Sequence, residues 1–126
     1  MATTPFIQAR MGSARLPGKV MKPLNGLPVI MHIVQRLEKC KRIDNIVVLT
    51  STKPENKALV DYLKSHGVAV FQGDEVNVLA RFQAALHHYP CDTVVRITGD
   101  TPLLDAEICD QLIHYFNSQA ADYAYL

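Results

Sequence analysis

The segment from Gln8 to Pro23 has the composition of a binding site for a phosphate group. It carries four cations, and no Asp or Glu occurs anywhere before Glu38, although the chain has twelve acids in all. Glycine lets backbone N–H groups approach an anion closely, and arginine and lysine neutralise its charge. The segment therefore predicts binding of a small molecule that carries phosphate. Its cations and glycines are Arg10, Gly12, Arg15, Gly18, Lys19 and Lys22.

The segment has two other possible interpretations. The first is a solvated basic loop between a strand and a helix, without a ligand. The second is a P-loop, which requires four residues between its glycines and a hydroxyl residue after its lysine. Here five residues separate Gly12 from Gly18, and Val20 stands where the hydroxyl residue would be. Both differences affect functional parts of a P-loop, so we exclude a P-loop ATPase.

Short apolar runs bounded by turn residues predict four strands. The β-branched run NIVVLT is typical of a strand buried in a parallel sheet. Pro5 has no N–H to donate, so we expect it to begin the first strand and not to lie within it. The expected strands are Phe6–Ala9, Asn45–Thr50, Val68–Phe71 and Thr93–Ile97.

Helical periodicity between and after these runs predicts four helices. Gly67 is expected to end the second helix, and Asp105 to cap the start of the fourth. Strands that alternate with helices predict a three-layer α/β fold with an open, mainly parallel sheet, in a single domain spanning residues 1–126. The expected helices are Pro28–Lys41, Pro54–His66, Val76–Tyr89 and Ala106–Ser118. The residues expected to face the core from the third helix are Leu79, Phe82, Leu86 and Tyr89.

Three loops are expected to meet at one edge of this sheet, because ligands of open parallel sheets bind beyond the carboxyl ends of the strands. The basic segment follows the first strand, Ser51 follows the second, and the turn Thr98–Asp100 follows the fourth. Mg²⁺ binds hard oxygen ligands, often with only one or two carboxylates. Asp100 is therefore a candidate Mg²⁺ ligand, and the alternative is that it merely caps a turn.

Composition excludes several other classes of protein. A net charge of +1 and the absence of tryptophan argue against broad nucleic-acid binding. No apolar run approaches the roughly 20 residues that span a bilayer, and the N-terminus lacks the pattern of a signal peptide. The three cysteines form no metal or redox motif, so Cys40 and Cys109 are interpreted as packing residues. We therefore expect a cytoplasmic protein with no nucleic-acid or membrane partner.

The stretch Gln8–Lys19, QARMGSARLPGK, resembles the signature loop of the cytidylyltransferase-like family. That family includes the spore-coat polysaccharide biosynthesis cytidylyltransferases and the enzymes that make CMP-activated acidic sugars. The resemblance continues, in order, through Val47–Thr52, Val78–Phe82 and Arg96–Leu103. Members of such families are substantially longer, so the chain resembles their N-terminal portion. The resemblance implies a Rossmann-like nucleotide-diphospho-sugar transferase topology, truncated at the C-terminus.

The resemblance also implies a reaction, the transfer of CMP from CTP to a sugar in surface or capsular polysaccharide biosynthesis, with Mg²⁺ as cofactor. Arg15 and Lys19 would be the catalytic residues that hold the triphosphate, and Asp100 would hold the metal. Main-chain groups near the start of the loop would meet the base. The nucleotide-binding candidates are Gln8, Ala9, Arg10, Gly12, Ser13, Ser51 and Arg81. The chain departs from the family pattern at Ala14, Asn77 and Ala80.

Two alternative functions stay open. One is a nucleotidyltransferase that joins UTP or dTTP to a sugar 1-phosphate. The other is a non-catalytic module that binds nucleotide or pairs with a partner chain, because in the resembling families the C-terminal portion supplies acceptor contacts and a second metal carboxylate. The run Asp122–Leu126 is expected to begin another strand, and a homodimer is expected.

Overall fold

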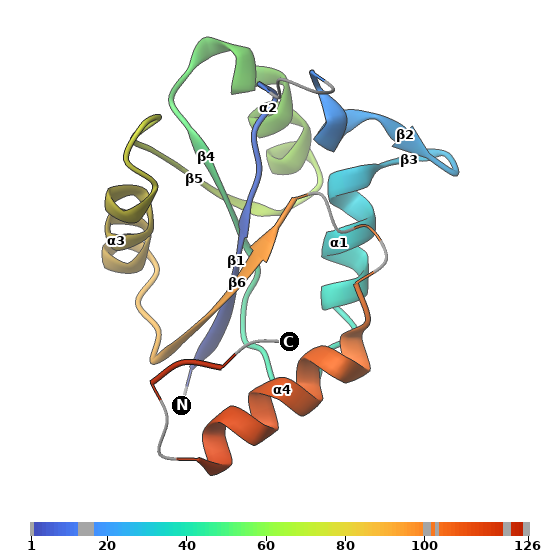
Figure 1. Ribbon diagram of the computed structural model, residues 1–126. Coiled ribbons are helices and arrows are strands. Elements are labelled where there is room, and N and C mark those ends of the chain that lie inside the picture. Colours follow the sequence, from blue (N-terminus) through green and yellow to red (C-terminus); the bar gives the residue numbers. More distant parts are fainter. Residues whose placement is uncertain (1, 13–16, 100–101, 103, 120–121, 125–126) are drawn as a thin grey trace.

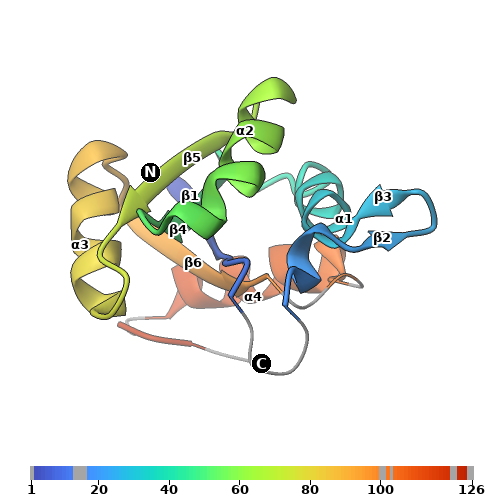
Figure 2. The same ribbon diagram turned by 90° about the horizontal axis from the view of Figure 1, so that it is seen from above.

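Four parallel strands form one sheet at the centre of the protein, with helices on both of its faces (Figures 1 and 2). The computed structural model describes residues 2–12, 17–99, 102, 104–119 and 122–124. The strand order is β5-β4-β1-β6, so β1 lies inside the sheet. This arrangement confirms the predicted α/β fold with a parallel sheet. The strands are β1 (Thr3–Gln8), β4 (Val47–Ser51), β5 (Ala69–Gly73) and β6 (Thr93–Thr98).

The main helices follow the predicted order along the chain. The structure also has two short 3-10 helices, η1 (Lys19–Met21) after β1 and η2 (Pro54–Asn56) directly before the second α-helix. The α-helices are α1 (Val29–Leu37), α2 (Lys57–Ser65), α3 (Val78–His88) and α4 (Ala106–Ser118). No helix in the described part of the chain is long and apolar enough to cross a membrane.

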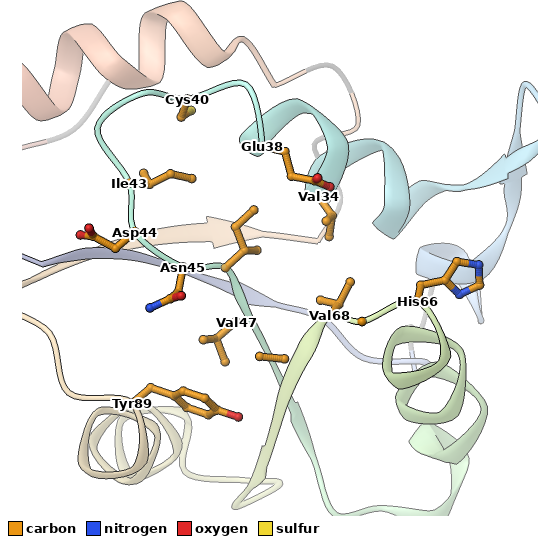
Figure 3. A pocket seen from close by; sticks show the side chains of 13 residues that line it. Val34, Glu38, Cys40, Ile43, Asp44, Asn45, Val47, His66, Val68 and Tyr89 are labelled. Atoms are coloured by element: carbon orange, nitrogen blue, oxygen red, sulfur yellow. The ribbon is translucent and has the colours of Figure 1, made fainter.

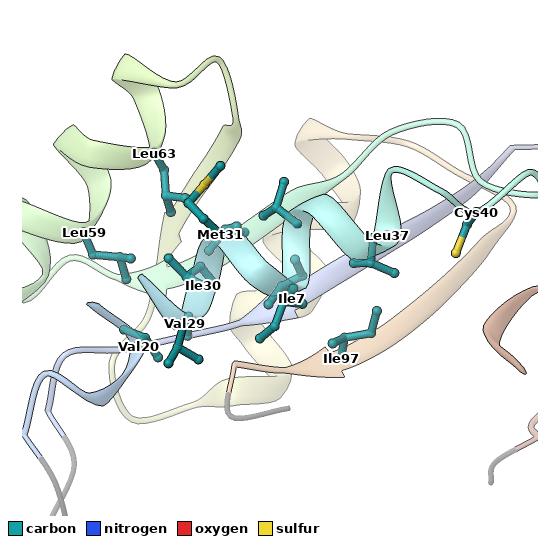
Figure 4. Close-up of a cluster of buried hydrophobic side chains, with 14 of the residues drawn as sticks. Ile7, Val20, Val29, Ile30, Met31, Leu37, Cys40, Leu59, Leu63 and Ile97 are labelled. Carbon is teal, nitrogen blue, oxygen red and sulfur yellow. The ribbon is translucent and has the colours of Figure 1, made fainter. Parts of the chain in front are cut away.

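Alternate residues of the central strands build two separate cores, because successive side chains of a strand point to opposite faces. Ile7 and Val48 pack with α1, α2 and α4 on one face, in the cluster shown in Figure 4. Phe6, Val47 and Leu49 pack with α3 on the other face. The sheet is thus covered on both sides, which is why the inner strand β4 begins with the continuous apolar run VVL.

The position predicted for Pro5 is wrong, because β1 begins at Thr3 and Pro5 lies within it. Thr3 donates its N–H to the Asp44 carboxylate at 2.7 Å and accepts the Asp44 N–H at 2.9 Å, both on the β4 side. Alternate residues of a strand bond in the same direction, so the missing N–H of Pro5 also faces this side. Pairing of β1 with β4 starts only at Phe6, opposite Val47, so no ladder bond is lost.

The core face predicted for α3 is wrong at two of its four positions. Leu79 is 71% exposed and Leu86 is 38% exposed. The buried residues of α3 are Arg81 and Ala85, while Phe82 stacks against Phe6 with ring centroids 6.1 Å apart. The small Ala85 side chain lets the helix approach the sheet. With Arg81 and Ala85 facing the sheet, Leu79 and Leu86 lie on the outer side of the helix.

The structure contains a short antiparallel hairpin that we did not predict. Its strands are β2 (Pro23–Leu24) and β3 (Leu27–Pro28), joined by Asn25 and Gly26. Both turn residues have positive φ, at 54° and 88°. Asn-Gly is the dipeptide that most favours such a turn, so the signal was present in the sequence.

The first helix is shorter than predicted, since α1 ends at Leu37 and not at Lys41. The N–H groups of Lys41 and Arg42 donate to the Asp110 carboxylate of α4 at 3.0–3.1 Å, which turns the chain away from the helix axis.

Beside this contact Cys40 and Cys109 are buried, as expected of packing residues. Burial raises the pKa of Cys40 to about 12, so its thiol stays protonated.

The predicted start of the fourth helix is confirmed, because the Asp105 carboxylate accepts the N–H groups of Glu107 and Ile108 at 2.9 and 3.1 Å. Replacing Asp105 by alanine should lower the free energy of unfolding by about 1 kcal/mol, through loss of this N-cap. Urea denaturation measures the change, and equal stability of the variant would contradict the capping role.

The strand expected at the end of the chain is not formed by residues 122–124, which are the part of it that the structure describes.

Candidate functional site

The carboxyl ends of β1, β4 and β6 lie level with one another. Gln8, the last residue of β1, is opposite Leu49 of β4 and Thr98 of β6. Beyond the strand, the Ala9 N–H donates to the Leu49 carbonyl at 3.0 Å, and the Gly99 N–H donates to the Gln8 carbonyl at 2.8 Å. The loops after these three strands therefore leave the sheet side by side, which is the arrangement the sequence predicted.

The loop that follows β1, residues 9–18, is called the glycine-rich loop below. A backbone hydrogen bond closes it. The Gly18 N–H donates to the Met11 carbonyl at 2.7 Å, and Gly18 adopts the left-handed conformation with φ of 72°. Lys19 follows at once as the first residue of η1, and Val20 is buried against α1. The loop thus brings Lys19 back to the region where the chain left β1. Ser13 and Arg15 lie outside the described residues.

The basic side chains of this loop have no acidic partner in the part of the chain that the structure describes. Arg10 is exposed, Lys19 is half-buried, and Lys22 is exposed. The two ion pairs between described residues lie elsewhere, at Lys53–Glu55 and Lys57–Asp61. The nearest described carboxylate, Glu55, lies against Gly12 and pairs with Lys53, so the described cations of the loop form no ion pair and are free to meet an anionic ligand.

Asn56 at the end of η2 is a site residue that our sequence analysis missed. It is fully buried, and its Oδ1 accepts the Met11 N–H at 2.8 Å. Its Nδ2 donates to the Ser51 hydroxyl at 2.7 Å. The side chain therefore joins the loop after β1 to the carboxyl end of β4. A polar residue at the start of a helix is usually interpreted as a cap, and this reading hides the role.

Ser51 and Gln8, both predicted to bind nucleotide, are engaged in the protein framework. Ser51 is 1% exposed, and its hydroxyl also accepts the Lys53 N–H at 3.3 Å. The Gln8 side chain accepts a hydrogen bond from Arg96 at 3.0 Å, and Arg96 lies 5.7 Å from the centroid of the Phe82 ring. The Gln8 side chain is thus held by the neighbouring strand β6.

Two glycines at this edge lie close to other atoms, Gly12 against the movable end of the Glu55 side chain and Gly99 against the backbone of β1. A Cβ on Gly12 would lie 2.5 Å from Oε1 of Glu55, so the carboxylate of Glu55 rests against the loop. A Cβ on Gly99 would lie 2.9 Å from the Gln8 carbonyl oxygen and 3.1 Å from Cβ of Ala9. Gly99 is therefore required for the close approach of β6 to the end of β1. Asp100, the next residue, lies outside the described residues.

Arg81 is buried in α3 and holds the loop that precedes this helix. It is 3% exposed, its Nε donates to the Asp74 carbonyl at 2.8 Å, and its Nη2 donates to the Glu75 carbonyl at 3.0 Å. The carboxylate of Asp74 accepts the N–H groups of Asn77 and Val76, and these bonds lower the pKa of Asp74. The predicted contact of Arg81 with the nucleotide stays a prediction.

Replacing Arg81 by methionine should lower the free energy of unfolding by about 1–3 kcal/mol, because two loop carbonyls would lose their donors. The measurement is denaturation in urea. Arg81→Lys should recover only part of the loss, since a lysine cannot reach both carbonyls with a planar fork. Unchanged stability of Arg81→Met would show that the two hydrogen bonds do not support the fold.

A magnesium site made entirely of protein side chains is not present among the described residues, where no three His, Cys, Asp or Glu side chains gather. Mg²⁺ does not need such a cage, because it commonly binds one or two carboxylates together with substrate phosphates and water. The close approach at Gly99 places Gly99 itself beside the end of β1. The carboxylate predicted to hold Mg²⁺, that of Asp100, lies outside the described residues, so its role stays a prediction.

Two cavities border the sheet, one at the amino ends of the strands and one that reaches the carboxyl end of β6 at Thr98. One of about 710 Å³ is at the amino ends of the strands, and Figure 3 shows Asp44, Asn45 and His66 along its wall. The other, of about 1130 Å³, lies between β6 and α4. Among the described residues, neither Lys19 nor the loop after β1 lines either cavity.

Comparisons with known proteins point to the same chemistry. The family model described as Cytidylyltransferase matches residues 5–126. The chain is 38% identical over 125 residues to the spore coat polysaccharide biosynthesis protein SpsF of Bacillus subtilis, covering 96% of this chain and 52% of that protein. It is 33% identical over 121 residues to the 8-amino-3,8-dideoxy-manno-octulosonate cytidylyltransferase of Shewanella sp. strain W3-18-1, covering 94% of this chain and 49% of that protein.

A solved structure supports the fold assignment. The cytidylyltransferase of Leptospira borgpetersenii superposes with a TM-score of 0.89 at 36% identity, over 96% of this chain and 51% of that chain. The chain thus spans about half the length of the relatives that it matches. The predicted resemblance and the predicted Rossmann-like topology are confirmed. From the family match and the loop geometry together, the chain belongs to the cytidylyltransferase family.

Proposed function

We propose that the protein takes part in transferring CMP from CTP to a sugar, with release of pyrophosphate. The observation that carries the proposal is the closed loop between Met11 and Gly18, which returns Lys19 to the carboxyl edge of the sheet. In open α/β sheets this edge is where nucleotides bind. In the reaction, a sugar hydroxyl oxygen bonds to the α-phosphorus of CTP. The bond to pyrophosphate breaks, and the hydroxyl proton passes to solvent.

The proposal assigns separate tasks to the residues of the loop. Lys19 and Arg15 neutralise the triphosphate and the charge that develops on the leaving pyrophosphate. The backbone of Gly12 and Ser13 meets phosphate oxygens, and Arg10 shapes the loop. The Ala9 N–H already bonds within the sheet, so the cytosine would meet the main-chain groups that follow it.

Magnesium belongs to the same proposal, with Asp100 as the residue that holds it. Held by Asp100, Mg²⁺ would offset the negative charge of the phosphates. Protein residues then have to orient the triphosphate for in-line attack. Ser51 would contribute through its place beneath the loop, and Arg81 would lie near the nucleotide as the family resemblance implies.

The proposed acceptor is a sugar of surface or capsular polysaccharide. The names of the Bacillus and Shewanella relatives support this class, since one refers to spore coat polysaccharide and the other to an octulosonate sugar. The proposal includes a homodimer and a cytoplasmic location. The three cysteines are free thiols, as expected of a reducing compartment.

Calorimetric titration tests the proposal, with CTP, UTP and ATP compared in the presence of Mg²⁺. CTP should bind in preference to the other two nucleotides, and Arg15→Ala should weaken this binding. Preference for UTP would instead support a sugar 1-phosphate nucleotidyltransferase. Absence of binding to all three nucleotides would overturn the proposal and favour a non-catalytic module.

A further inference from the structure

Asn56 is buried without the role that its position in the chain would suggest. It immediately precedes α2, where asparagine normally accepts a hydrogen bond from the first turn of the helix. Its side chain makes no such bond to α2. Instead, Oδ1 of Asn56 points to the Met11 N–H and Nδ2 points to the Ser51 hydroxyl. Its hydrogen-bonding groups therefore serve the loop and not the helix.

Both backbone polar groups of Met11 are consequently hydrogen-bonded. Its N–H is bound by Asn56 at 2.8 Å, and its carbonyl is bound by the Gly18 N–H at 2.7 Å. Both ends of the loop are thus held at Met11, which Asn56 links to Ser51 of β4. Lys19 directly follows this fixed point, so its place depends on the bonds that hold Met11.

The attachment is rigid because it continues into the sheet. The Ser51 carbonyl accepts a hydrogen bond from Gln72 of β5 at 3.2 Å, and Ser51 itself belongs to β4. Asn56 is enclosed, with no exposed surface, so water cannot replace its bond to Met11 while the fold is intact. A buried donor that loses its partner is costly, which makes this arrangement well determined.

We infer that Asn56 is a positioning residue that holds the glycine-rich loop in the form that receives the CTP triphosphate. The inference rests on the proposed function, since it concerns how the proposed phosphate loop is preorganised. Ordering a loop before binding reduces the cost of binding, so loss of the contact should weaken affinity. The effect passes through Met11, and Asn56 itself does not touch the nucleotide.

The test combines amide hydrogen exchange at Met11 with titration of CTP and Mg²⁺. Asn56→Ala should speed exchange of the Met11 N–H in the ligand-free chain and weaken CTP binding about tenfold or more. Asn56→Asp keeps an oxygen that can accept the Met11 N–H, so it should restore protection of this amide. Because a carboxylate near the phosphates is unfavourable, it should restore affinity only in part.

Asp105→Ala is the matched control, since it destabilises the fold at α4 without touching the loop. It should leave both Met11 protection and CTP affinity unchanged. If Asn56→Ala binds CTP as tightly as the unchanged chain, or if Asp105→Ala weakens binding equally, the positioning role is wrong. If the unchanged chain binds no CTP, the proposed function fails, and this inference fails with it. Should Asn56→Ala not fold, the two readouts on Asn56→Asp decide the question.

Discussion

Replacing Lys19 by alanine is expected to slow CTP-dependent pyrophosphate release by 10²-fold or more, equivalent to about 3 kcal/mol of transition-state stabilisation. Lys19 follows Gly18, whose N–H closes the loop, and no described acid competes for its charge. Its ammonium group is therefore available to the triphosphate. The measurement is the rate of pyrophosphate release with CTP, Mg²⁺ and an octulosonate acceptor. Calorimetry of CTP binding gives a readout that needs no acceptor.

Lys22→Ala is the matched control, because it removes the same charge three residues further along the chain. Lys22 is exposed, and its N–H donates to the Lys19 carbonyl. This bond joins main-chain groups, so neither substitution removes it. Its effect should be small, since an exposed charge outside direct contact is screened by salt. Equal losses in the two variants would show that general positive charge, and not the placement of Lys19, attracts the nucleotide.

Replacing Gly99 by alanine is expected to disturb both the fold and the site. The new Cβ would lie within about 3 Å of the Gln8 carbonyl oxygen, at the end of the central strand, and of Ala9 directly after it, and neither can move freely. Overpacking of this kind costs about 1–3 kcal/mol of unfolding free energy. Separating β6 from the end of β1 should also displace the residues that follow Gly99, so CTP affinity in the presence of Mg²⁺ should fall.

Gly67→Ala separates these two effects. Gly67 has φ of 74° and no neighbour near its missing side chain, so alanine there brings backbone strain of about 1 kcal/mol without a clash. Urea denaturation should show both variants to be destabilised, whereas titration should show lost CTP binding only for Gly99→Ala. Normal CTP affinity in Gly99→Ala would mean that the close approach of the two strands is not needed for the site.

Local signals in the sequence were sufficient for most elements of the fold. The β-branched run before Ser51 forms β4, Gly67 follows the end of α2, and Asp105 caps α4. Each of these features depends on residues within a few positions of one another. The convergence of the loops followed from one further rule, that ligands bind at the carboxyl ends of parallel strands.

The features that we missed depend on contacts between distant segments. Asn56 serves Met11, 45 residues earlier, so nothing beside it in the sequence reveals its role. The buried face of α3 is set by Arg81, which turns to loop carbonyls, and by the fit of Ala85 to the sheet. Pro5 is tolerated within β1 because β4 begins to pair only after it. Periodicity cannot anticipate such pairings.

The central place of β1 has a consequence for how the protein forms. β1 is synthesised before the other strands of this sheet, yet one of its two neighbours, β6, ends at Thr98, and the amide of Ala2 bonds to Asp92, 90 residues later. Pairing over such a separation is slow, because a long stretch of chain must be closed first. During synthesis, the wall of the site that contains Gly99 is therefore completed after the glycine-rich loop, α1 and α2 are already available to fold. CTP would bind only once this late pairing is complete, so nucleotide would stabilise the last step of assembly by mass action.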